Sequence, residues 1–171
     1  MTGDRAALDD LTADEIVDLL ALEPLPAEGG MWAQTWLDEH STAIYFLLRP
    51  ADFSAFHRLA GPELWHHYCG AAVDLVLLSD DRGIERVDLG TDLRNGERPV
   101  VVVPPGTWMA ARTTGPWSLV GTTMSPPFDW QSFELGSRHD LLRRFPDAAD
   151  EIRSLTRVEP DPQPDPRPDQ E

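Results

Sequence analysis

The residues best suited to chemistry lie in one short stretch, which contains His57, Glu63 and His67. A histidine titrates near neutral pH, and a neighbouring carboxylate can fix its tautomer, so this set could carry out general acid–base catalysis. Two imidazoles and one carboxylate also form a recognised iron(II) set, and the same donors suit zinc. The residue types therefore leave two interpretations open, a metal-free catalytic site and a site for a divalent metal.

Strand periodicity predicts which of these side chains meet. Alternate residues of a β-strand share a face, so Glu63, Trp65 and His67 should point to one side and Tyr68 to the other. His57 ends the preceding predicted strand and should approach Glu63 across a Gly-Pro turn. The pattern predicts a cavity with one carboxylate, one or two imidazoles and aromatic walls.

The composition narrows the classes of function. The chain has 171 residues and a formal net charge of -16, and such an acidic protein repels phosphate backbones, which argues against a nucleic-acid partner. All 14 basic residues are Arg, so no mechanism can use a lysine Schiff base. No apolar run approaches the ~20 residues that span a bilayer, and the first residues do not resemble a signal peptide. We therefore expect a cytoplasmic protein without a membrane partner.

Short strands separated by turn residues dominate the middle of the chain. Eight or more such strands without intervening helices favour an antiparallel barrel or sandwich. The predicted strands are Met31–Leu37, Ala43–Leu48, Phe53–Arg58, Leu64–Cys69, Ala72–Leu78, Ile84–Leu89, Pro99–Val103, Trp108–Arg112 and Trp117–Met124.

Helices are predicted on both sides of these strands, over residues 12–22 and 137–155. Thr12 and Glu15 form the sequence signature of a capping box at the start of the first helix. We predict one domain over residues 12–157, with the barrel at about 30–135. Residues 1–11 should be a flexible acidic N-terminus, and the Pro/Asp-rich residues 158–171 a disordered tail.

Several stretches together resemble the cupin superfamily, in its single-domain branch of mostly uncharacterised function. Residues 57–70 read HRLAGPELWHHYCG, residues 103–108 read VPPGTW, and Glu28-Gly29-Gly30 also fits. The resemblance implies an all-β fold, a cupin jelly-roll β-barrel (double-stranded β-helix) with short flanking N- and C-terminal helices. It also implies a homodimer, for which strand Met31–Leu37 is a candidate edge.

The same resemblance implies that two metal-ligand positions have become apolar. Leu59 stands where the first motif has its second His, and Met109 stands where the second motif has a His. We therefore expect no cofactor. The alternative is a divalent metal such as iron, zinc or manganese held by His57, Glu63 and His67.

The predicted function is the binding of a small polar organic ligand in the barrel. The predicted catalytic residues are His57, Glu63 and His67. The predicted ligand-binding residues are Trp65, Tyr68, Trp108, Met109 and Arg112, of which Arg112 could clamp an anionic ligand. Three classes compete: a metal-independent isomerase or epimerase-like enzyme, a metal-dependent enzyme such as a dioxygenase, and a non-catalytic binding module.

Overall fold

The computed structural model of the protein describes residues 8–157. The predicted tail at 158–171 and most of the predicted flexible N-terminus lie outside the described residues; residues Leu8–Asp10 form a 3-10 helix, η1. Within residues 8–157, no helix combines the length and the apolar character needed to cross a membrane.

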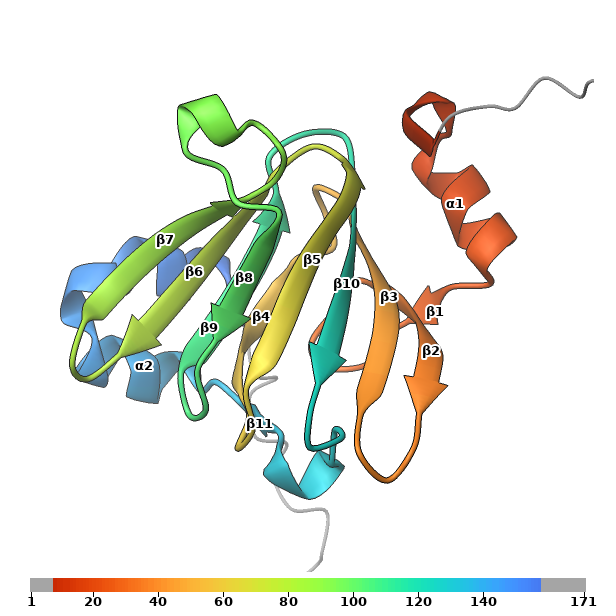
Figure 1. The fold of residues 1–171 in the computed structure, drawn as a ribbon. Helices are drawn as coiled ribbons and strands as arrows, with labels where there is room; N and C mark the ends of the chain where they lie inside the picture. Colours follow the sequence, from red (N-terminus) through yellow and green to blue (C-terminus); the bar gives the residue numbers. More distant parts are fainter. Residues whose placement is uncertain (1–7, 158–171) are drawn as a thin grey trace, which may run out of the picture.

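Two antiparallel sheets face each other and form the barrel (Figure 1). The six-stranded sheet has the order β1-β2-β3-β10-β5-β8, and the five-stranded sheet has the order β11-β4-β9-β6-β7. This arrangement confirms the predicted all-β jelly-roll fold. The strands are β1 (Glu23–Pro24), β2 (Met31–Leu37), β3 (Thr42–Leu48), β4 (Ser54–Arg58), β5 (Glu63–Gly70), β6 (Val73–Ser79), β7 (Gly83–Leu89), β8 (Val100–Val103), β9 (Trp108–Thr113), β10 (Ser118–Met124) and β11 (Glu134–Leu135).

Alternation along the strands divides their side chains between two layers. In β6, Val73, Leu75 and Leu77 point between the sheets, while Val76 and Leu78 point outward against the C-terminal helices. All five are buried, because each face of this strand is covered. The main apolar core therefore lies inside the barrel, and a second cluster lies outside the five-stranded sheet.

Helix α1 (Ala13–Leu20) packs on the outer face of the six-stranded sheet. Its capping box forms as predicted: Glu15 N donates to Thr12 Oγ1, and the Glu15 carboxylate accepts from Thr12 N at 2.8 Å. Ile16 is buried with Leu47, which belongs to β3.

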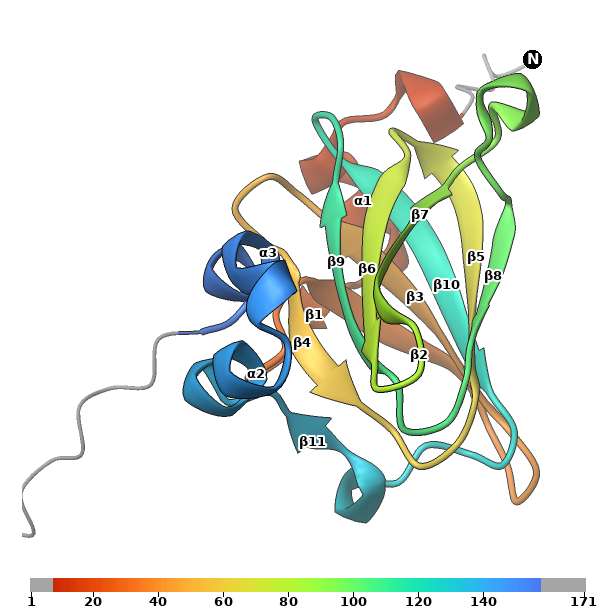
Figure 2. The same ribbon diagram turned by 90° about the vertical axis from the view of Figure 1, so that its left-hand side faces the viewer.

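The C-terminal segment covers the outer face of the five-stranded sheet (Figure 2). The predicted helical stretch 137–155 is divided into α2 (Arg138–Arg144), η4 (Pro146–Ala148) and α3 (Ala149–Ser154). Pro146 lacks an N–H and starts the second segment, as expected of proline at a helix N-terminus. Two further 3-10 helices, η2 (Leu93–Asn95) and η3 (Trp130–Ser132), lie in loops.

A register shift interrupts the pairing of β5 with β10. Leu119 pairs with Cys69, and Val120 pairs with His67, so Tyr68 is the extra residue of a β-bulge. The shift lets β5 place Trp65 in the barrel core and Cys69 in the outer layer beneath α1.

The strand predicted as a dimer edge lies near the margin of the six-stranded sheet. β1 pairs only with Met31 and Trp32, while β3 pairs along most of the other side of β2. A homodimer formed through this strand stays a prediction.

Candidate functional site

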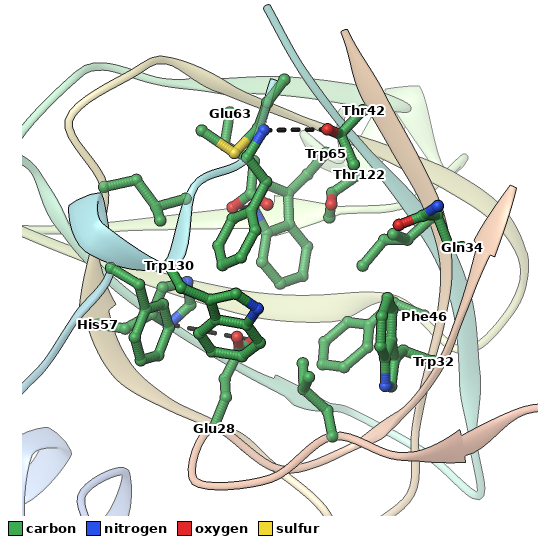
Figure 3. Close-up of a pocket in the computed structure, with 16 residues that line it drawn as sticks. Glu28, Trp32, Gln34, Thr42, Phe46, His57, Glu63, Trp65, Thr122 and Trp130 are labelled. Atoms are coloured by element: carbon green, nitrogen blue, oxygen red, sulfur yellow. Dashed lines mark hydrogen bonds and ion pairs between the residues drawn. The ribbon is translucent and has the colours of Figure 1, made fainter. Parts of the chain in front are cut away.

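A cavity of about 120 Å³ lies between the two sheets. It is bounded by the strands β2, β3, β4, β5 and β10 and by three loops, one before β2, one between β4 and β5 and one after β10 (Figure 3). The lining residues are Leu25, Glu28, Trp32, Gln34, Thr42, Ile44, Phe46, His57, Leu59, Glu63, Trp65, Thr122, Met124, Phe128, Trp130 and Phe133.

His57 is held in a defined orientation on β4. It is 2% exposed, and its Nδ1 lies 2.9 Å from the carbonyl oxygen of Ala55. Because a carbonyl can only accept a hydrogen bond, Nδ1 must carry the proton. In the neutral ring, Nε2 is then the nitrogen that can take up a proton. The imidazole also stacks on Phe133, with 5.4 Å between ring centroids.

Glu63 is the first residue of β5 and is buried in the same cavity. Its Oε2 accepts a hydrogen bond from Trp65 Nε1 at 2.9 Å. Burial raises the pKa of the carboxyl; the His57 imidazole opposes the rise, the Glu28 carboxylate adds to it, and hydrogen bonds from Thr122 and Trp65 oppose it. Glu63 therefore keeps its proton to a higher pH than an exposed glutamate does.

Glu28 brings a second carboxylate to the cavity from the loop before β2. Its Oε1 accepts from Ser54 Oγ at 2.7 Å and lies 4.0 Å from His57 Nδ1. The site prediction missed Glu28, although Glu28-Gly29-Gly30 belongs to the stretches that resemble cupins.

The loop that carries Glu28 is fixed by close contacts. Arg157 Nη2 donates to the carbonyl oxygens of Glu28 at 3.1 Å and Phe53 at 2.9 Å. Gly29 has a φ of +101°, and a Cβ there would collide with Arg157 Nη2. A glycine is therefore required where the guanidinium reaches the loop.

Aromatic rings form most of the remaining wall. Phe46 and Trp65 make an edge contact at 5.9 Å between centroids, and Trp130 makes edge contacts with Phe128 at 5.0 Å and Phe133 at 5.6 Å. Figure 3 shows Trp32, Phe46, Trp65 and Trp130 around an open space, with Glu28 and Glu63 at its margin. The sequence interpretation missed Trp32 and Trp130. Strand parity could have found Trp32, but η3 offers no periodic signal for Trp130.

The structure brings three of the predicted site residues together, His57, Glu63 and Trp65. His67 does not line this cavity. Its Nε2 lies 3.0 Å from the carbonyl oxygen of Ala71, and its buried Nδ1 has no hydrogen-bond partner within residues 8–157.

The remaining predicted ligand-binding residues lie elsewhere, which corrects their expected placement. Trp108 and Arg112 point out of the barrel, because Met109 between them takes the inward position in β9. Trp108 packs beneath the C-terminal helices, and Arg112 forms an ion pair with Asp74. Met109 is 1% exposed and fills the core. Tyr68, displaced by the bulge, is exposed and contacts Tyr45.

A family model described as Cupin superfamily (DUF985) matches residues 14–136, which is more than half of the chain. The chain belongs to the cupin superfamily. This match confirms the resemblance found in the sequence.

Solved structures agree with this membership. A protein from Shewanella oneidensis shares 33% identity with this cupin, with 87% of this chain and 99% of that chain covered and a TM-score of 0.82. A hypothetical protein from Leishmania major shares 25% identity, with coverage of 86% and 100% and a TM-score of 0.81. A cupin 2 conserved barrel domain protein from Rhodopseudomonas palustris shares 16% identity, with coverage of 80% and 90% and a TM-score of 0.56, which shows the fold alone. No curated protein sequence matches this cupin.

The residues present do not fit the metal centre that the cupin resemblance implies. Leu59 and Met109 occupy two of the ligand positions, and His67, the proposed replacement, lies outside the cavity. Within residues 8–157, no group of three or more His, Cys, Asp or Glu side chains is placed to hold a metal ion.

Proposed function

We propose that this cupin binds a small polar organic ligand in the barrel and moves a proton on it without a metal, as an isomerase or epimerase does. His57 Nε2 is the base, and the Glu63 carboxyl is the acid. The observation that carries the proposal is that one cavity holds both an imidazole fixed as the Nδ1–H tautomer and a buried carboxyl whose pKa is raised.

These two groups suit a proton transfer through an enol. His57 takes a proton from a carbon beside a carbonyl group, while Glu63 gives its proton to the carbonyl oxygen. In a ligand with a hydroxyl on the deprotonated carbon this gives an enediol. Glu63 then takes the proton of that hydroxyl and His57 returns a proton to the former carbonyl carbon, so the carbonyl and hydroxyl groups have exchanged places and both residues are restored. Tyr45 and Tyr68 contact each other away from the cavity lining, so the acid role goes to Glu63 rather than to a tyrosine.

Two other classes remain as outcomes of the tests. The metal-dependent class would need stoichiometric iron, zinc or manganese in the purified protein, lost on His57→Ala. The class without catalysis would bind a ligand through the same walls but leave its C–H bonds unexchanged.

Deuterium incorporation tests the proposal directly. The full chain is incubated in D2O with small polar carbonyl compounds that raise its Tm, and exchange at the carbon beside the carbonyl is followed by NMR. We expect exchange in the parent protein and a loss of at least about 100-fold in His57→Gln and in Glu63→Gln, as is typical for general acid–base residues.

His67→Gln is the matched control, because His67 is an imidazole on β5, the strand that carries Glu63, and does not line the cavity. It should keep the exchange rate of the parent. A ligand that binds without any exchange would leave a binding module and contradict the catalytic part. Stoichiometric metal in the active protein would contradict the metal-free part.

A further inference from the structure

We propose that the ligand of this cavity is a small organic cation, an amine or a quaternary ammonium compound. This inference rests on the proposed function, because it assigns a chemical class to the ligand of the same site.

The cavity is lined by acidic side chains. Two carboxylic groups line it, Glu28 and Glu63, and no Arg side chain of residues 8–157 does. The chain contains no Lys at all. His57 is therefore the one side chain among the lining residues that can become positive, and the neutral groups Ser54 and Trp65 donate hydrogen bonds to the two carboxylic groups.

Several arginines instead neutralise carboxylates outside the cavity. Arg49 pairs with Asp52 at 2.7 Å, Arg58 with Glu134 at 2.6 Å, and Arg112 with Asp74 at 2.6 Å. A carboxylate that leaves water without a cationic partner is costly, and the cost is offset when a ligand brings the missing positive charge. The Glu28 carboxylate also repels carboxylates and phosphates, so the cavity disfavours anions.

Aromatic rings form a large part of the wall of the cavity. Three tryptophans and three phenylalanines line the cavity, and several of them meet edge to face, so that their ring planes enclose space from different directions. The face of an aromatic ring attracts a cation, and tryptophan does so most strongly. Cages of this composition suit ammonium groups, because the cation contacts several ring faces and needs no hydrogen bond from the wall.

The volume of the cavity limits the size of the ligand. The cavity volume of about 120 Å³ is somewhat smaller than the ~150 Å³ cavity that encloses benzene in another protein. Benzene has six non-hydrogen atoms. A cation of roughly five to seven non-hydrogen atoms therefore matches this space. A nucleotide sugar is several times larger and carries two phosphates, so it fits neither the volume nor the charge.

Choline and 3,3-dimethyl-1-butanol provide a matched pair of probes, because they have the same shape and differ in the charged nitrogen. Binding of each to the full chain is measured by isothermal titration calorimetry, with tetramethylammonium as a second cation. We expect choline to bind at least tenfold more tightly than the neutral alcohol. We expect Glu28→Gln to reduce this preference to less than threefold.

Glu39→Gln is the control for Glu28→Gln, because Glu39 is 86% exposed and does not line the cavity. It should keep the preference for choline. The comparison of the two probes on the parent protein stands even if Glu28→Gln does not fold.

Two results would overturn the inference. Equal or tighter binding of the neutral alcohol would show that the cavity selects shape rather than charge. A neutral or anionic compound that binds where neither cation does at millimolar concentration would exclude the cation and leave the proposed function standing. If no small molecule binds at all, the proposed function fails together with this inference.

Discussion

The two halves of the barrel interior have different contents. Around β6 and β9 the interior is solid, since Val73, Leu75, Met109 and Ala111 are at most 1% exposed and pack against one another. Around β2, β3 and the start of β5 the interior opens into the cavity with its carboxyls and aromatic rings. One half is therefore packed core, and the other half contains the cavity of the proposed site.

In this cupin the second motif contributes Met109 to the packed core and not to the lining of the cavity. Met109 lies directly opposite His57 in the β4–β9 pairing, so a side chain there is close enough to take part in a site. As a methionine it belongs to the packed core. The imidazole and the two carboxyl groups of the site come instead from β4, β5 and the loop that carries Glu28.

The largest expected effect breaks the packed half. Leu75 is fully buried, so Leu75→Ala should lower the free energy of unfolding by about 2–5 kcal/mol, measured by urea denaturation. Ile44→Ala, which truncates a side chain beside the cavity, should cost less because that side chain is only partly buried. Equal losses in the two variants would contradict the division of the interior.

The next effect concerns Glu63 and pH. Burial raises its pKa above the ordinary value of 4.5, so the folded protein binds this proton more tightly than the unfolded chain does. The contribution of Glu63 to stability is therefore fully present below pH 4.5 and is lost as pH rises through the raised pKa. Glu63→Gln should flatten this fall and raise the Tm at neutral pH relative to the parent.

Thermal unfolding between pH 4 and 8 measures this effect. Glu39→Gln, which removes an exposed carboxylate, serves as the control and should keep the slope of the parent. The same slope in the parent and in Glu63→Gln would contradict the raised pKa of Glu63.

A smaller effect separates binding from stability in the open half. Trp130 is 59% exposed and lines the cavity, so Trp130→Ala should change the free energy of unfolding by no more than about 0.5 kcal/mol. It should weaken choline binding by about 1 kcal/mol, roughly fivefold, through the loss of one ring face. Trp36→Ala is the matched control, because Trp36 is 56% exposed and does not line the cavity. Equal affinities in the two variants, measured by calorimetry, would remove Trp130 from the site.

The smallest effect is expected at Arg112. Its ion pair with Asp74 leaves the Arg side chain 41% exposed, and solvent weakens such pairs, so Arg112→Ala should cost about 0–1 kcal/mol in stability. Ligand affinity should not change, because the guanidinium lies outside the barrel. A loss of affinity in this variant would restore Arg112 as a ligand clamp.

Local patterns in the sequence were sufficient for the fold and for part of the site. The nine predicted strands agree with the structure within one residue at each end, because alternating apolar residues and turn residues determine them locally. His57, Glu63 and Trp65 followed from the same strand logic.

The rest of the site depends on contacts between distant segments. Glu28 and Trp130 lie in loops, where no periodicity reveals which way a side chain points. The bulge at Tyr68 changes the alternation of β5 near its end, and no residue pattern in the sequence predicts this bulge. Trp108 and Met109 are adjacent, so parity allowed only one of them to point inward, and the apolar environment selected Met109.

The contact between Arg157 and the loop of Glu28 links the wall of the cavity to a residue outside the barrel. Arg157 lies beyond α3, well past residue 136, at which the family match stops. A chain cut at that boundary would keep every residue that lines the cavity and lose the guanidinium that holds two backbone carbonyls beside it. The segment that stabilises the cavity therefore extends beyond the barrel, since Arg157 holds the loop that carries Glu28 in place.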